Sequence, residues 1–183
     1  MTYLRLVRSS PSNASGDDAC LVAFQKELSY IHRTFVRLRV PPSEVEDLVQ
    51  ELFLVLRHVW DQYDPGRPIR PYLFGIAFRL ASGNQRKRGR ETKSGFYVLP
   101  DPGPSPEDIL ESSRARALLL EALDQVPMPR RAVLVMHELD LVPVAEVASA
   151  LSIPVFTVYS RLRKGRRELD RALRRTLRRL ESR

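Results

Sequence analysis

The segment Pro143–Lys164, PVAEVASALSIPVFTVYSRLRK, constrains the fold of this chain more than any other stretch. Apolar residues recur at helical spacing on both sides of Ser152-Ile153-Pro154. A proline disfavours helical angles in the residue before it, so the pattern predicts two short helices that meet at an angle, a helix-turn-helix. The predicted inward-facing residues are Val144, Val147, Ala148 and Leu151 in the first helix and Val155, Val158 and Leu162 in the second.

The second of these helices also carries polar and cationic residues outside its apolar stripe. Such side chains suit the phosphates and base edges of a DNA major groove, whereas an ordinary helical hairpin with a solvated face is the alternative interpretation. The candidate DNA-binding residues are Thr157, Tyr159, Ser160, Arg161, Arg163, Lys164 and Arg166.

Charge is distributed in blocks along the 183 residues, whose net charge is +8. Residues 161–183 hold eleven basic and three acidic side chains, residues 67–93 hold eight basic and one acidic, and residues 43–64 hold six acidic and one basic. Two basic blocks and one acidic block predict two nucleic-acid contacts and a separate surface for another partner. No apolar run approaches the roughly 20 residues of a membrane span, so we expect a cytoplasmic protein without membrane insertion.

Helical periodicity predicts a first domain over residues 17–90, preceded by a disordered tail at 1–16. Its first helix runs from Asp17 to about Leu38. Ser43 caps a second helix to about Trp60, with Glu46 completing a capping box. A loop at 61–71 precedes a third helix that starts at Pro71. The residues expected to face inward from the first helix are Leu21, Phe24, Leu28, Ile31, Phe35 and Leu38.

Residues 91–105 are rich in proline and glycine and have the composition of a flexible linker. Helices are then expected from about 106 to 124 and from 129 to 139, followed by the helix-turn-helix. The prediction is an all-α fold of two small helical domains, 17–90 and 106–183, joined by the linker at 91–105.

Several ordered segments resemble bacterial RNA polymerase sigma factors of the extracytoplasmic-function (ECF) group. The most characteristic is Glu46–Phe53, EDLVQELF, which is similar to the family's polymerase-docking helix. Further matching segments are Tyr72–Ala77 followed by Arg86–Arg88, Leu123–Pro127 with Arg130-Arg131, Glu146–Ala148, and Thr157–Leu162.

The resemblance implies a transcription initiation factor that binds the clamp helices of core RNA polymerase, recognises a bipartite promoter and promotes melting. It further implies an anti-sigma factor as a partner. Asp47, Gln50 and Glu51 would offer polar groups to the polymerase, with Phe53 as an aromatic anchor. The same residues would otherwise be the solvated side of an amphipathic helix.

The family's downstream promoter module would hold a base turned out of the melted strand, by stacking and phosphate contacts. Tyr72 occupies a position where relatives usually place a core tryptophan, so packing is as good an interpretation as stacking. Arg79 stands where many relatives have an asparagine. The candidate residues are Tyr63, Arg67, Arg70, Tyr72, Arg79, Arg86, Lys87 and Arg88.

No nucleophile elbow, phosphate loop or metal-ligand spacing is present in the sequence, so we expect neither enzymatic activity nor a cofactor. A free-standing helix-turn-helix regulator is the alternative function, and a basic RNA-binding protein is a rival from another class. Phe156 replaces a glycine typical of the family and Tyr159 replaces a common Lys or Arg. Those two residues either read a different upstream sequence or bind a protein.

Overall fold

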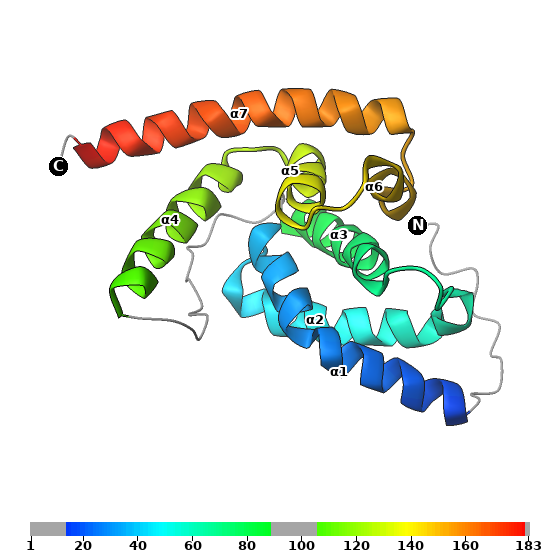
Figure 1. Cartoon of the computed structure of the whole chain (residues 1–183). Helices are drawn as coiled ribbons and strands as arrows, with labels where there is room; N and C mark the ends of the chain where they lie inside the picture. The colour runs from blue at the N-terminus through cyan, green and yellow to red at the C-terminus, as the bar shows by residue number, and fades with distance from the viewer. Residues whose placement is uncertain (1–13, 89–105, 182–183) are drawn as a thin grey trace.

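A computed structural model describes residues 14–88 and 106–181, and all regular elements in these ranges are helical, as predicted (Figure 1). The proposed linker at 91–105 lies outside the described residues, and its flexibility stays a prediction. None of the described helices is long and apolar enough to cross a membrane. The first half consists of α1 (Ala14–Arg37), α2 (Pro42–His58), the 3-10 turn η1 (Trp60–Gln62) and α3 (Ile69–Arg88). The second consists of α4 (Pro106–Asp124), α5 (Met128–Leu134), the π-helical turn η2 (Val135–Leu139), α6 (Val144–Leu151) and α7 (Val155–Glu181).

Helices α1, α2 and α3 pack against one another through their apolar faces. The prediction for α1 was wrong at Leu21 and Leu28, which are 40% and 37% exposed. Ile31, Phe35 and Leu38 are buried as predicted, but earlier in α1 the buried residues are Cys20 and Glu27, each one position before the leucine that was expected to face inward. Glu27 tolerates burial because Arg70 of α3 donates to its carboxylate at 2.8 Å.

The predicted capping box at the start of α2 is also wrong. The helix begins at Pro42, with Pro41 as the residue before it, and no side chain caps its free amides. Ser43 therefore lies inside the first turn rather than at the cap. Proline suits this position because the amide it lacks would have no partner within the helix. The loop between α2 and α3 is shorter than the predicted range 61–71. The turn η1 continues to Gln62, and α3 already begins at Ile69.

The helix-turn-helix is confirmed in α6 and α7. Ser152 ends α6 in the left-handed conformation, with φ of 53°, and Pro154 precedes α7. Val158 and Leu162 are buried, whereas Val155, predicted to face inward, is 46% exposed. Val155 is the first residue of α7 and lies before the turn that packs on α6.

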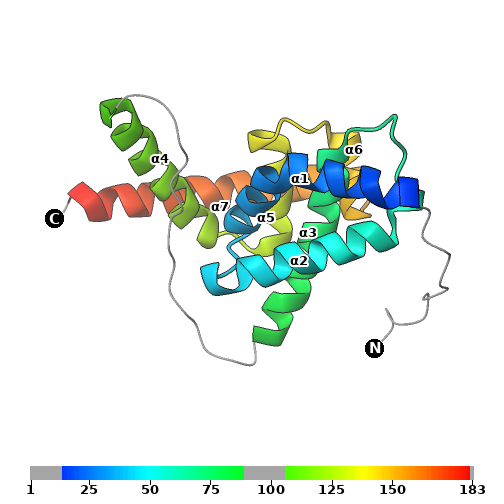
Figure 2. The same ribbon diagram turned by 90° about the horizontal axis from the view of Figure 1, so that it is seen from below.

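Helix α7 continues without a break to Glu181 (Figure 2). It lies close to α5 where Gly165 is buried against Leu134. A Cβ at residue 165 would lie 3.0 Å from the Leu134 side chain, so the absence of a side chain there permits the close approach. Further along, α4 contacts α7, and Arg179 donates a hydrogen bond to Glu121. The arginine-rich C-terminal run thus extends the last helix, and its contact with DNA stays a prediction.

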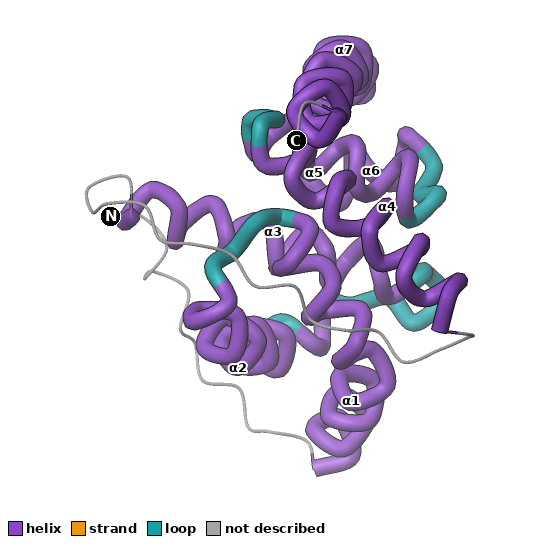
Figure 3. The backbone as a smooth tube through the Cα atoms, turned by 90° about the vertical axis from the view of Figure 1, so that its left-hand side faces the viewer, coloured by secondary structure: helices purple, strands orange, loops and turns teal. Residues whose placement is uncertain are grey.

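The two halves are in direct contact. Figures 1 and 3 show α7 on one side of the molecule, α5 and α6 beneath it, α3 next, and α1 and α2 on the far side. Helices α3 and α6 form the central contact. A Cβ added at Gly75 of α3 would lie 2.4 Å from the carbonyl oxygen of Ala150 in α6. The absence of a side chain at residue 75 therefore sets how closely the halves approach.

Candidate polymerase- and DNA-binding surfaces

Three of the predicted docking residues lie together on the outer face of α2. Asp47, Gln50 and Glu51 are exposed, and their spacing of three and four residues places them on one face of the helix. Leu54 continues the same spacing and is 63% exposed. We call these four residues the acidic stripe. It offers carboxylates, an amide and one apolar side chain to a basic partner.

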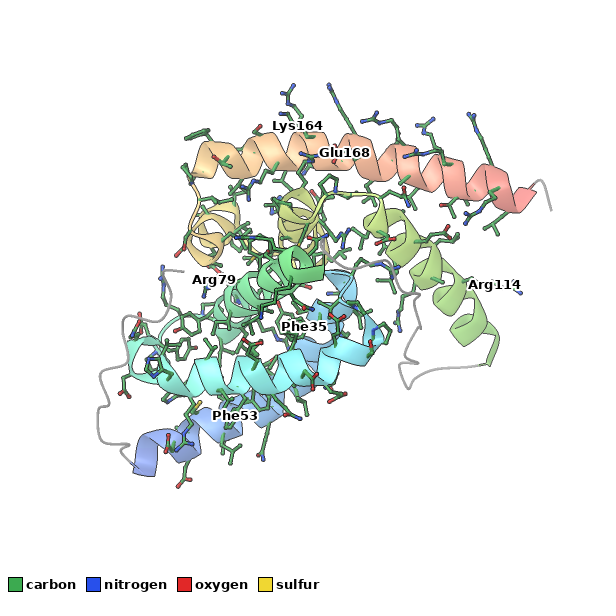
Figure 4. The ribbon with its side chains drawn as sticks, turned by 180° about the vertical axis from the view of Figure 1, so that it is seen from behind. Phe35, Phe53, Arg79, Arg114, Lys164 and Glu168 are labelled. Carbon is green, nitrogen blue, oxygen red and sulfur yellow. The ribbon has the colours of Figure 1, made fainter. Side chains whose placement is uncertain are left out.

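Phe53, the predicted aromatic anchor, is only partly exposed and lies toward α1 (Figure 4). Its ring packs against that of Phe24, with centroids 4.8 Å apart. Most of this side chain therefore stabilises the α1–α2 contact. Sequence reasoning selected Phe53 for its ring and missed Leu54, although the spacing of Leu54 from Gln50 and Glu51 was a usable signal.

An aromatic ladder lies where η1 leads into α3. The Tyr63 ring stands between those of Trp60 and Tyr72, with centroids 5.3 Å from each. The Tyr63 hydroxyl donates to the carbonyl of Arg67 at 2.6 Å, and burial raises the pKa of Tyr63 and of Tyr72. Both tyrosines are half-buried.

The predicted phosphate contacts of the loop and of α3 differ in whether they are already paired. Arg67 is exposed on the loop, and Arg86 and Lys87 are exposed near the end of α3. Arg70 is already engaged, since it pairs with Glu27 at 2.8 Å and its guanidinium lies 5.2 Å from the centre of the Tyr30 ring. The Arg88 side chain lies outside the described set.

Arg79 is exposed on α3 next to the contact with α6 (Figure 4). The Arg79 Nη1 atom lies 3.6 Å from the position that a Cβ would take at Gly75, and that position is also the one that would meet the carbonyl oxygen of Ala150 in α6. The structure thus places one predicted single-strand contact beside the helix-turn-helix.

Most predicted residues of the recognition helix face solvent. Tyr159, Ser160, Arg163 and Lys164 are exposed, while Thr157 and Arg161 are half-buried beside the packed face. Arg166 is exposed but donates two hydrogen bonds to Glu138, at 2.9 and 2.6 Å. For Arg166, a DNA contact would have to compete with that ion pair.

A polar junction that no sequence pattern predicted joins the two halves. Asp140 directly follows the π-helical turn η2, and its amide donates a hydrogen bond to the carbonyl of Val135 at 3.0 Å. This turn directs the Asp140 carboxylate at α1, where it accepts a hydrogen bond from Tyr30 at 2.9 Å and from Arg37 at 2.6 Å. Burial and the nearby carboxylate raise the pKa of Tyr30.

Arg131 forms the second part of the junction. It is 4% exposed and donates to the carbonyl of Leu38 at 2.6 Å and to that of Val126 at 2.9 Å. Burial lowers the pKa of Arg131 to about 10, although Asp124 opposes the shift. A buried guanidinium needs several acceptors, and here carbonyls from both halves supply them. The resemblance had assigned Arg131 only to the start of the C-terminal domain.

Comparison with known proteins separates the chain into two known regions. Residues 23–91 match the family described as Sigma-70 region 2, and residues 116–169 match Sigma-70, region 4. The chain is 29% identical over 165 residues to the ECF RNA polymerase sigma factor SigE of Mycolicibacterium smegmatis, covering 86% of this chain and 64% of that relative. It is 28% identical over 155 residues to the ECF sigma factor SigW of Bacillus subtilis, covering 79% and 83%.

Two solved structures share the fold. One is the sigma factor RpoE in complex with the anti-sigma factor NepR from Bartonella quintana, with a TM-score of 0.66, 19% identity and coverage of 82% of this chain and 95% of that one. The other is CnrH in complex with the cytosolic domain of CnrY, with a TM-score of 0.60, 22% identity and coverage of 87% and 93%. With regions 2 and 4 in this order, and with ECF sigma factors as its relatives, the chain belongs to the bacterial RNA polymerase sigma factors of the ECF group.

Proposed function

We propose that this chain binds core RNA polymerase, directs it to a bipartite promoter and promotes melting of the DNA. The observation that carries the proposal is the separation of three exposed surfaces on three helices of one chain. These surfaces are the acidic stripe on α2, the exposed cations near the end of α3, and the recognition face of α7. A protein that only binds duplex through a helix-turn-helix needs the last of these alone.

The acidic stripe is the proposed docking surface for the clamp helices of the polymerase. Its carboxylates would pair with basic residues, and Leu54 would supply the apolar contact that a specific interface needs near its centre. Helix α2, which carries the stripe, lies on the far side of the molecule from α7 (Figure 1). Docking would therefore leave the recognition helix free to reach DNA.

The aromatic ladder and the exposed cations of the preceding loop and of α3 are the proposed site for the melted strand. The half-buried rings of Tyr63 and Tyr72 are the proposed stacking surface, and the exposed Arg67 is the proposed phosphate contact beside them. Arg86 and Lys87 lie at the other end of α3 and are proposed phosphate contacts further along the strand. Stacking is worth about 1–3 kcal/mol per base, which is comparable to the cost of turning a base out of a duplex.

We propose that the contact between α3 and α6 opens when the chain binds both promoter elements. The residues between Arg88 and Pro106 could bridge roughly 60 Å if extended, so the chain is long enough to let the halves part. We propose that polymerase binding supplies the free energy for this separation.

Regulation by an anti-sigma factor is proposed from the solved relatives, one of which is bound to an anti-sigma factor. Because polymerase and promoter DNA are the proposed partners, the proposed location is the bacterial cytoplasm.

Run-off transcription with purified chain, bacterial core polymerase and a promoter library tests the proposal. Transcripts should start from a subset of templates only when both proteins are present. Replacing Asp47, Gln50 and Glu51 with alanine should weaken binding to core and reduce the transcript without lowering the melting temperature. Asp170→Ala removes an exposed carboxylate from α7 and is the matched control.

Failure to transcribe from any template, with a folded chain and active core, would contradict the proposal. Sequence-specific duplex binding that core does not affect would instead favour a free-standing regulator. Binding to RNA without promoter preference would favour the RNA-binding alternative.

A further inference from the structure

Two aromatic side chains are exposed at the start of the recognition helix. Phe156 is 74% and Tyr159 is 59% exposed, and their spacing of three residues places them on one face of α7. Among the phenylalanines whose side chains the structure describes, Phe156 alone is exposed. The fold buries Val158 and Leu162 on the other side of the helix, so it does not use either ring for packing.

The position of these rings matches the part of a helix-turn-helix that meets bases. The N-terminal residues of a recognition helix contact base edges in the major groove, and Phe156 and Tyr159 lie in the first two turns of α7. The same face continues with the exposed cations Arg163, Lys164 and Arg167. In Figure 4, Lys164 lies on the side of α7 away from α5 and α6. The face therefore has apolar rings where bases would lie and positive charge where phosphates would follow.

The chemistry of the major groove selects the base. A phenyl ring cannot satisfy the amino, carbonyl or ring-nitrogen groups of base edges, and it removes water from any that it covers. The C5-methyl of thymine is the apolar group that the major groove offers. A ring over that methyl gains contact area, whereas the same ring over a cytosine amino group leaves a donor without a partner.

We propose that Phe156 and Tyr159 determine promoter specificity by contacting thymine C5-methyl groups in the major groove of the upstream element. This inference rests on the proposed function. Phe156 and Tyr159 contact DNA rather than a protein, because the cations on the same face of α7 complement the negative charge of a phosphate backbone.

Removal of the methyl groups tests the inference directly. The upstream element would first be selected from a randomised duplex library with the assembled polymerase and chain. Each thymine in the selected duplex would then be replaced by deoxyuridine, which lacks the methyl. Loss of one contacted methyl should weaken binding about fourfold, the equivalent of roughly 0.8 kcal/mol.

Variants of the chain assign that effect to a residue. Phe156→Ala should bind the thymine and deoxyuridine duplexes with equal affinity at the position that Phe156 contacts, because the contact is already lost. Arg167→Ala is the matched control. It removes an exposed cation from the same face, so it should weaken both duplexes equally and keep the fourfold ratio. Both residues are exposed, so neither change should alter folding.

Equal affinity of the unmodified chain for every deoxyuridine duplex would overturn the inference, as would a ratio that Phe156→Ala leaves unchanged. Loss of binding to core polymerase in Phe156→Ala, with DNA selectivity retained, would show that the ring contacts protein and would overturn it as well. If selection and transcription succeed but binding does not depend on the thymine methyl groups, this inference alone is contradicted and the proposed function stands. Failure of both selection and transcription contradicts the proposed function, and the inference with it.

Discussion

Replacing Gly75 with alanine should push α3 and α6 apart and weaken the contact between the two halves. The new Cβ would lie 2.4 Å from the carbonyl oxygen of Ala150, whereas carbon and oxygen normally approach to about 3.3–3.6 Å. The obstacle is backbone, so no side-chain rotation relieves it. The helices would have to separate by roughly 1 Å, enough to forfeit a quarter to a half of the dispersion energy across the contact.

Gly83 provides an internal control in the same helix. A Cβ there would meet no atom within 4 Å, so Gly83→Ala should stabilise the protein by up to about 1 kcal/mol through helix propensity alone. Gly75→Ala gains the same propensity but incurs the cost of overpacking, typically about 1–3 kcal/mol. The difference in free energy of unfolding between the two variants should therefore be about 1–3 kcal/mol.

Urea denaturation and thermal melting measure this difference. For a protein of this size about 1 kcal/mol shifts the melting temperature by roughly 2–4 °C, so the two variants should differ by several degrees. If only Gly75→Ala divides the transition into two steps, the halves unfold separately once their contact is weakened. Equal stabilisation by both substitutions would refute the close approach of α3 and α6.

Three further predictions address other parts of the structure. Asp140→Ala should lower the free energy of unfolding by about 1–3 kcal/mol, because it leaves the buried Tyr30 hydroxyl without its acceptor. The control Asp170→Ala breaks an exposed ion pair and should lower it by less than about 1 kcal/mol. Equal losses in the two variants would count against a stabilising role of Asp140 between the halves. Replacing Arg86 or Lys87 with alanine should reduce the slope of log binding constant against log salt by about 0.9 per duplex contact or about 0.7 per single-strand contact, and an unaltered slope would mean that neither contacts DNA. Burial raises the pKa of the Cys20 thiol above its ordinary 9.0, so the folded state disfavours the thiolate. Above pH 9.0 the thiol of the unfolded chain ionises more readily than that of the folded chain, and the free energy of unfolding should therefore fall as pH rises past that value. Iodoacetamide should accordingly modify Cys20 slowly at pH 9.0 until denaturant is added, and rapid modification of the folded chain would contradict its burial.

Local patterns predicted the helices well because amphipathic spacing and proline positions act over a few residues. The break at Ser152 and Pro154 is such a case, since a left-handed residue and a proline end one helix and start the next. The errors also had local causes. Leu21 and Leu28 follow a plausible apolar spacing, but neighbouring helices cover a seam displaced from it.

The contact between the halves could not be predicted from such patterns. Tyr30 and Asp140 are 110 positions apart, and the π-helical turn that brings them together has no recognisable local signature. Arg70 shows the same limit within the first half, because its position after a loop suggested a phosphate contact while its partner Glu27 lies 43 positions away. Charge and spacing identified candidate surfaces, but long-range pairing decides which side chains are free to act.

Permanganate reactivity of unpaired thymines on promoter DNA tests the central proposal most directly. Duplex from the promoter library would be treated with the chain alone, with core polymerase alone, and with both. Thymines of the downstream element should react only when both proteins are present, and the signal should be weaker when Asp47, Gln50 and Glu51 are replaced with alanine. Duplex that stays unreactive with both proteins, or that core opens equally well alone, would contradict it.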